Sequence, residues 1–319
     1  MNARPAWPRV LLGGTPVDLF ETPEAVTAIV GHAARAPGAA WPLGVMSANL
    51  DHIHHFGYHG PSSLVPFAWA HPGAGEPFPG SYAGAVRARA DRRAAPPVRW
   101  LNLLDGAPLV RHAAHLTGRA WPRLAGSDLV DPVLDAAEAR GLTVGFLGGR
   151  PEVLGTLSRR LADDRPGLVV GGFWSPERAE LDDADRCRVW AEKVRAARVD
   201  ILVVGLGKPR QERWIVRYGP LTGASVLLAF GAVVDFLAGV VPRAPEPVRE
   251  HGMEWAWRLA HEPRRLARRY LVDGPPAYEV LARRSFVLVP CAPSAAGTDP
   301  GDVRDGTARA ARPSPAVAP

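Results

Sequence analysis

Asp105 is a carboxylate at a position where a buried strand is expected to end. It follows the apolar residues Leu101, Leu103 and Leu104 and precedes Gly106. A carboxylate placed in this way can accept a proton from a hydroxyl group, which is general base chemistry. Asp-Gly is also a common turn dipeptide, in which the aspartate bonds to the nearby backbone. The residues alone leave Asp105 as either a general base or a turn residue.

Ser47 and Asn49 follow a second apolar run, residues 43–46, at another expected strand end. A hydroxyl group and an amide at such a position can bind the polar groups of a small molecule. The alternative is a capping role, because Ser and Asn are frequent N-caps and a helix is expected from Leu50 onward. Both interpretations stay open on the residues alone.

The stretch 200–214 has the pattern of a strand, a glycine turn and a helix start, with Gln211 opening the expected helix. In open parallel α/β sheets, ligands bind at the carboxyl ends of strands. Glycine lets the backbone approach a ligand closely, and the N–H groups of a helix N-terminus favour anions. With the donors of Lys208 and Gln211, this turn predicts a site for an anionic small molecule.

Three further candidate residues stand at expected strand ends. Gly148 and Gly149 form a turn that can admit a nucleotide, although the chain has no GxGxxG dinucleotide pattern. Asp235 follows the last expected strand, where it either contacts a ligand or acts as a structural cap.

Two groups of potential metal ligands are interpreted as structural. Asp183-Ala184-Asp185 matches an Asp-x-Asp pattern but lies in a polar run at an expected helix start, where acidic residues complement the helix dipole. In the stretch 51–55, no set of Cys or Glu completes a metal site, and the histidines are interpreted as surface or capping residues. We therefore expect neither a metal nor a cofactor.

The composition indicates a protein with a substantial core and an anionic partner. The chain has 319 residues, 47% of them hydrophobic, and a net charge of +6. Its two cysteines, Cys187 and Cys291, suit a reducing compartment and support no disulfide framework or zinc cluster. No basic segment followed by a long apolar run opens the sequence, so we expect no signal peptide, and no stretch approaches the ~20 apolar residues of a spanning helix. We expect a soluble or peripheral cytoplasmic protein.

Helix and strand patterns alternate regularly from residue 128, which predicts an α/β fold with a Rossmann-like open, mainly parallel sheet flanked by helices. The expected helices are 128–140, 151–163, 182–198 and 211–218, and the expected strands are 143–147, 168–170, 201–204 and 225–230. Earlier in the chain, residues 15–18 are interpreted as a turn.

Three parts of the chain differ in composition. Residues 1–242 are the predicted catalytic core, interrupted at 57–97 by a Pro-, Gly- and Arg-rich insertion that we expect to be flexible. Residues 243–286 are predicted to form a basic helical appendage. Residues 287–319, rich in Pro, Ala and Gly, are expected to be a disordered tail.

The appendage carries arginines at a spacing that brings like charges together. Pro263 is expected in the first turn of a helix on which Arg264 and Arg268 are i, i+4 partners, as are Arg265 and Arg269. Each such pair costs an isolated helix roughly 0.2–0.5 kcal/mol, so the arrangement indicates an anionic partner. Arginines beside tryptophans are typical of a helix on a membrane surface, and a core-packed helix with a solvated face is the alternative. No nucleic-acid reading motif accompanies them.

Several short motifs stand in one order over residues 9–285. They are Ser47-Ala48-Asn49, Asp105-Gly106-Ala107-Pro108-Leu109-Val110, Gly126-Ser127-Asp128-Leu129, Phe146-Leu147-Gly148-Gly149, Gly205-Leu206-Gly207-Lys208-Pro209-Arg210-Gln211-Glu212, Asp235-Phe236, Arg243-Ala244-Pro245, and Glu254-Trp255 with the arginines that follow. This set resembles the glycosyltransferases of the WecG/TagA/CpsF family. The insertion 57–97 has no counterpart in that family, and Ser47 stands where a Thr is usual, which keeps the hydroxyl.

The resemblance implies an enzyme that moves an N-acetylmannosamine-type sugar from its UDP form to a polyprenyl-diphosphate-linked sugar. Such enzymes work on the inner face of the cell membrane, as peripheral proteins, in making wall polymers or surface glycans. The resemblance gives Asp105 the role of base and assigns Gln211 to the nucleotide sugar. It also gives the appendage a place at the membrane, with its arginines reaching the active site. Homo-oligomerisation stays open.

Two other classes of function remain as alternatives. A Rossmann-type oxidoreductase would carry a GxGxxG turn followed by an acidic residue about 20 positions later, and the chain lacks this pattern. A non-catalytic nucleotide-binding or membrane-docking protein would tolerate the loss of Asp105, whereas the enzyme would not.

Overall fold

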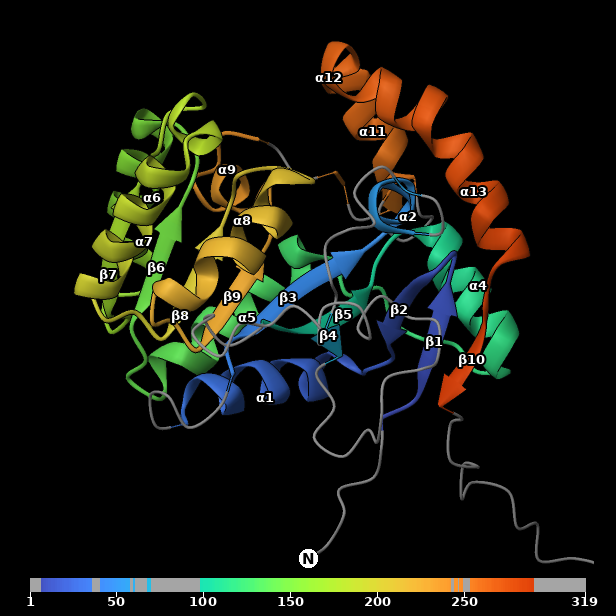
Figure 1. The fold of residues 1–319 in the computed structure, drawn as a ribbon, viewed down its shortest axis with the longest axis horizontal. Helices are drawn as coiled ribbons and strands as arrows, with labels where there is room; N and C mark the ends of the chain where they lie inside the picture. Colours follow the sequence, from blue (N-terminus) through green and yellow to red (C-terminus); the bar gives the residue numbers. More distant parts are fainter. Residues whose placement is uncertain are drawn as a thin grey trace, which may run out of the picture.

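The computed structural model describes residues 7–35, 41–57, 60, 68–69, 98–241, 244–245, 247–248 and 253–289. These residues form a ten-stranded, mostly parallel sheet with helices on both faces, so the predicted α/β Rossmann-like architecture is confirmed (Figure 1). The strand order is β10-β1-β2-β5-β3-β9-β8-β6-β7, and β4 pairs with β5. The strands are β1 (Arg9–Leu12), β2 (Thr15–Asp18), β3 (Leu43–Ala48), β4 (Ala68–Trp69), β5 (Arg99–Leu104), β6 (Val144–Leu147), β7 (Val170–Trp174), β8 (Ile201–Val204), β9 (Val226–Ala229) and β10 (Phe286–Val289).

Two hydrophobic cores lie on opposite faces of the sheet because successive side chains of a strand point to opposite sides. In β3, Val45 belongs to one core and Met46 to the other. The first core is covered by α1 (Thr22–Ala33), α5 (Gly126–Glu138), α6 (Pro151–Asp164) and α9 (Val233–Leu237). The second is covered by α2 (Leu50–Phe56), α4 (Ala107–Thr117), α7 (Ala184–Ala196), α8 (Arg210–Tyr218) and α13 (Gly274–Arg283). The central strands are buried on both faces, which explains their continuous apolar runs.

The order of the strands in the sheet switches direction at β3. β5 pairs with one edge of β3 and β9 with the other, and both pairings are parallel. The carboxyl ends of β3, β5 and β9 therefore meet on one rim of the sheet, and β8 joins them beside β9. A crevice outside such a reversal is where open α/β sheets bind ligands.

Residues 15–18 form strand β2 rather than the predicted turn. The turn lies two residues earlier, at Gly13 and Gly14, whose φ angles are 57° and 87°. Two consecutive positive φ values are the geometry of a tight hairpin turn, so β1 and β2 pair antiparallel around it. The Gly13-Gly14 dipeptide is the sequence feature that indicates this hairpin turn.

The end of the appendage rejoins the core, which corrects the predicted boundary of the tail. Residues 286–289 form β10, an edge strand that pairs antiparallel with β1, and residues 290–319 lie outside the described part. α13 packs against α2 and α4 and runs back toward β10 (Figure 1). Removing everything after residue 242 would therefore take a strand from the sheet as well as the basic segment.

Most of the insertion 57–97 lies outside the described residues, so its predicted flexibility stays a prediction. Within it, Ala68 and Trp69 form the short strand β4, which pairs with β5 at Arg99 and Trp100. From Glu254 onward, the described appendage forms α11 (Glu254–His261), α12 (Pro263–Ala267) and a π-helical turn, η3 (Arg268–Asp273), that leads into α13. Pro263 stands in the first turn of α12, as predicted.

Candidate active site

A cleft of about 1040 Å³ opens on the rim where β3, β5, β8 and β9 end. The turns that follow all four strands line it, together with the N-terminus of α5 and the appendage residues Arg268, Arg269 and Tyr270. Five of the predicted residues line this cleft directly from the core, and two more come from the appendage. They are Ser47, Asn49, Asp105, Lys208 and Asp235, with Arg268 and Arg269.

Asp105 is held by two N–H donors on the cleft wall. Its Oδ2 accepts a hydrogen bond from Asn49 Nδ2 at 3.1 Å, and its Oδ1 accepts one from the Gly106 backbone N–H at 2.7 Å. The second contact joins adjacent residues, whereas the aspartate of the predicted Asx-turn would bond to the backbone two residues on. The two contacts together fix the carboxylate where it lines the cleft.

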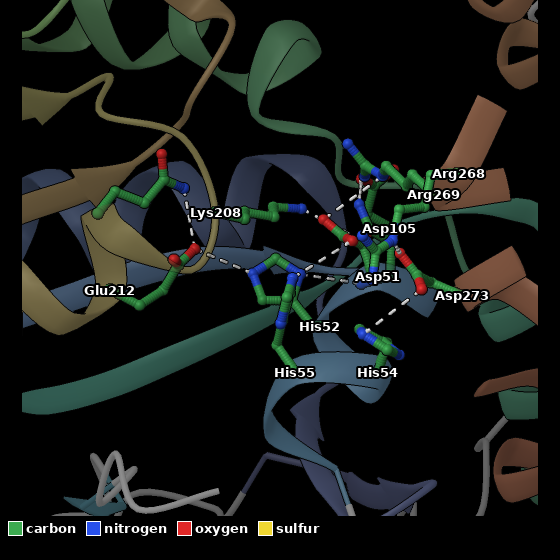
Figure 2. A network of polar contacts seen from close by, with 12 residues as sticks. Asp51, His52, His54, His55, Asp105, Lys208, Glu212, Arg268, Arg269 and Asp273 are labelled. Carbon is green, nitrogen blue, oxygen red and sulfur yellow. Dashed lines mark hydrogen bonds and ion pairs between the residues drawn. The ribbon is translucent and has the colours of Figure 1, made fainter. Parts of the chain in front are cut away.

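Lys208 reaches from the turn after β8 toward Asp105 (Figure 2). Its Nζ donates to Asn49 Oδ1 at 3.2 Å, so Asn49 bridges the ammonium and the carboxylate. Removal from water, together with repulsion from Arg269, lowers the pKa of Lys208 to about 8, although Asp51, Glu212 and Asp105 oppose this shift. Lys208 is therefore a cation that can lose its proton near physiological pH.

A buried pair, His52 and Glu212, lies behind Lys208, and the sequence did not reveal it. Asn49 is the N-cap of α2, and its backbone N–H donates to His52 Nδ1 at 3.3 Å. Because Nδ1 accepts, the proton of the neutral ring is assigned to Nε2, which lies 3.2 Å from Glu212 Oε1. Burial lowers the pKa of His52 well below its ordinary value and raises the pKa of Glu212 to about 7.

Of the two roles predicted for the histidines in 51–55, surface or capping, His52 has the capping role. His52 has no exposed surface because α2 lies on the sheet with this side chain turned toward α8. The Asp183-Ala184-Asp185 motif has its predicted place at a helix start. Asp183 is the N-cap of α7, and its side chain accepts from the backbone N–H groups of Asp185 and Arg186.

Gln211 opens α8 as predicted, but it is fully buried and is not among the residues that line the cleft. Its Nε2 donates to Glu212 Oε1 and to the Ala229 carbonyl oxygen, both at 2.9 Å. A Cβ on Gly231, which lines the cleft, would stand 3.0 Å from Gln211 Oε1, so the amide lies close to this glycine. A contact between Gln211 and a nucleotide sugar stays a prediction.

Ser47 and Asp235 lie at the cleft, each with a structural task. Ser47 Oγ donates to the Leu124 carbonyl oxygen at 2.9 Å, which joins β3 to the loop before α5. Asp235 belongs to α9, and its carbonyl oxygen accepts from the backbone N–H of Val240. Their binding roles stay predictions.

Gly148 and Gly149 do not line the cleft, and their backbone explains their residue type. Gly148 has a φ of 104°, and a Cβ there would lie 2.5 Å from the Gly205 carbonyl oxygen. The turn after β6 therefore packs directly on the turn after β8, which carries Lys208. Gly148 therefore contributes to the packing beneath the Lys208 turn rather than to the lining of the cleft.

Replacing Gly148 with Ala is expected to lower the free energy of unfolding by about 2–4 kcal/mol, since both the left-handed backbone and the close carbonyl resist a methyl group. Gly155 is the matched control, because it lies within α6 and a Cβ there meets nothing within 4 Å. Gly155→Ala is expected to stabilise by about 0.5–1 kcal/mol. Urea unfolding measures both, and equal effects of the two variants would contradict the packing role of Gly148.

The arginines of the appendage divide into two groups. Arg268 and Arg269 enter the cleft from the side opposite Lys208 (Figure 2). Arg269 Nε lies 3.4 Å from Asp51 Oδ2, and Arg268 Nε lies 3.8 Å from Asp273 Oδ2. Arg264 is exposed and does not line the cleft, and the side chain of Arg265 is outside the description.

Comparison with known protein families matches residues 83–287 to the group described as "Glycosyl transferase WecG/TagA/CpsF family". This match spans more than half of the chain and includes Asp105, Lys208 and the appendage arginines. The chain belongs to the WecG/TagA/CpsF family. The resemblance inferred from the motifs is thereby confirmed, and glycosyl transfer replaces the oxidoreductase alternative.

In this family member, Ser47, Asn49 and α2 lie before the matched residues, although α2 forms one wall of the cleft. Other cleft residues were not predicted from the sequence, namely Asp51, His55, Arg111, Arg123, Trp255, Tyr270, Asp273 and Tyr278. Most of them lie on helices, where a local pattern does not indicate which face meets the cleft. No helix within the described ranges is both long and apolar enough to span a bilayer.

Proposed function

We propose that this glycosyltransferase moves an N-acetylmannosamine-type sugar from UDP to a polyprenyl-diphosphate-linked sugar acceptor, with Asp105 as the general base. The observation that carries the proposal is the Asp105 carboxylate, fixed by Asn49 and Gly106 on the wall of a cleft that Arg268 and Arg269 also line. The sugar, the nucleotide and the acceptor come from the family resemblance.

The proposed reaction needs one proton acceptor and one place for negative charge. Asp105 takes the proton of the acceptor hydroxyl while the oxygen of that hydroxyl forms a bond to the anomeric carbon of the donor. The bond from that carbon to the β-phosphate oxygen breaks, and its electron pair leaves with UDP. The N–H groups of Asn49 Nδ2 and the Gly106 backbone donate to Asp105 and hold its carboxylate in place for this transfer.

The arginines of η3 support a diphosphate-binding role. Charge-assisted hydrogen bonds are ~2.7–2.9 Å long, and the separations of 3.4 and 3.8 Å to Asp51 and Asp273 exceed this. The guanidinium groups are thus held near the cleft by ion pairs and keep donors for a diphosphate. α5 adds an N-terminus without a side-chain cap at the same cleft, which favours an anion.

Exposed apolar side chains beside these arginines support a peripheral membrane location on the cytoplasmic face. Leu271 and Val272 of η3 are 63% and 60% exposed, and Trp255 and Tyr278 at the cleft are also exposed. Apolar and aromatic groups next to basic ones suit an anionic membrane surface. This surface would bring a lipid-linked acceptor to the cleft without a spanning helix.

The proposed activity is tested with a panel of UDP-sugars and a polyprenyl-diphosphate-linked sugar acceptor, assayed with and without a chelator of divalent ions. We expect transfer from UDP-N-acetylmannosamine to exceed transfer from the other donors, with the same rate in the presence of chelator, because the arginines supply the charge that a metal supplies elsewhere. A requirement for a divalent ion would contradict the arginine role. Absence of transfer from every donor would contradict the proposed function.

A further inference from the structure

The chain contains only two lysines, Lys193 and Lys208, among 38 basic residues. Lys193 lies on the surface of α7 over the ring of Trp190. Lys208 instead lies at the cleft, where groups from four elements surround it: Asp51 and His52 on α2, Asp105 after β5, Glu212 on α8 and Arg269 on η3. A compact ammonium differs from a planar guanidinium in that it can lose its proton when burial lowers its pKa.

Asn49 lies between Lys208 and Asp105 and can satisfy them in only one orientation. Its Oδ1 lies 3.2 Å from Lys208 Nζ and its Nδ2 lies 3.1 Å from Asp105 Oδ2. An ammonium only donates and a carboxylate only accepts. Turning the amide over would place Nδ2 against the ammonium and Oδ1 against the carboxylate, so both hydrogen bonds would be lost.

We infer that Lys208 is a positioning residue for the proposed base: its ammonium holds the Asn49 amide so that an N–H of Asn49 fixes the Asp105 carboxylate. The inference rests on the proposed function and adds a residue that acts on Asp105 through Asn49. A neutral Lys208 amine can also accept a hydrogen bond, so the orientation of Asn49 loses one of its two constraints when the proton leaves and depends on Asp105 alone. Because the pKa of Lys208 is about 8, the transfer rate is expected to fall as pH rises through that value.

The first test observes the contact without measuring activity. Lysine-selective ¹³C labelling gives two Cε resonances, with Lys193 as the internal reference. Asp105 raises the pKa of Lys208, so Asp105→Asn is expected to lower that pKa further while leaving the titration of Lys193 unchanged. An unchanged Lys208 titration in this variant would overturn the inference, whether or not the enzyme transfers the proposed sugar.

The second test is a kinetic double-mutant cycle with Lys208→Met and Asn49→Ser. Serine keeps an N-cap for α2 but lacks the amide that bridges to Asp105. Each variant is expected to lose about 100-fold in kcat, with the KM for the donor changed by less than about 2-fold, because a misplaced base slows chemistry. The double variant is expected to be no slower than the slower single one.

Two outcomes of the cycle would overturn the inference: additive losses, or a raised donor KM with an unchanged kcat, which would make Lys208 a diphosphate ligand. Lys193→Met is the matched control and is expected to keep wild-type rates. Should Lys208→Met fail to fold, the pH profiles of the wild type and Asn49→Ser decide. The wild type is expected to lose kcat/KM with an apparent pKa near 8. Asn49→Ser is expected to lack this alkaline limb, and retention of the limb would contradict the inference.

Discussion

Replacing Asp105 with Asn is expected to lower kcat by about 1000-fold, because general base catalysis contributes roughly 10²–10⁴-fold. The substitution keeps the shape of the side chain but removes its ability to take a proton. It also replaces, by an amide, the carboxylate that accepts a hydrogen bond from Asn49 Nδ2 in the wild type. Initial rates with saturating donor and acceptor measure the effect.

Two controls separate the loss of a base from a loss of fold or binding. Asp185→Asn makes the same chemical change on the exposed surface of α7, where 89% of the side chain is accessible, and is expected to keep full activity. Calorimetric titration with UDP-sugar is expected to show that Asp105→Asn still binds its donor. More than a tenth of the wild-type rate in this variant would rule out Asp105 as the base.

Replacing Glu212 with Ala is expected to lower the free energy of unfolding by about 3 kcal/mol, which for this size is a drop in Tm of roughly 5–10 °C. The substitution leaves a cavity and removes the acceptor shared by His52 Nε2 and Gln211 Nε2. Glu192→Ala, on the exposed face of α7, is the matched control and is expected to change stability by less than about 0.5 kcal/mol. Thermal unfolding distinguishes the two.

Glu212→Gln tests the charge of the same group, since it keeps an acceptor for His52 and Gln211. The pKa of Glu212 is raised from 4.5 to about 7 in the folded protein, so the folded state holds this proton more tightly than the unfolded state. Its contribution to stability is therefore complete below about pH 4.5 and is lost as pH rises through about 7. Relative to Glu212→Gln, the wild type is expected to be more stable at pH 5 than at pH 7.5 in urea unfolding. The opposite trend would contradict the raised pKa.

The sequence predicted best those site residues that follow a strand directly. Asp105, Asn49 and Lys208 each come within a few positions of an apolar run, and a parallel sheet brings such ends to one rim. Their alternatives were predicted for the same reason, since a residue at a strand end can cap the next helix. Asn49 is at once the N-cap of α2 and a partner of Asp105.

Pairings between distant parts of the chain could not be predicted in this way. His52 and Glu212 are 160 positions apart, and no local pattern indicates that α2 and α8 turn these side chains toward each other. Gln211 illustrates the same limit, because its helix start was predicted correctly while its burial beneath Gly231 depends on β9. Strand β10 was not predicted, because a run of four residues does not indicate that it pairs with the distant edge strand β1.

The pairing of β10 with β1 means that the basic segment is a strap fixed at both ends, leaving the core after α9 and returning to it through α13. A free tail would have to give up its backbone entropy each time it met a substrate. A strap has given up much of that freedom during folding, so Arg268 and Arg269 meet an incoming diphosphate with little further ordering of their backbone.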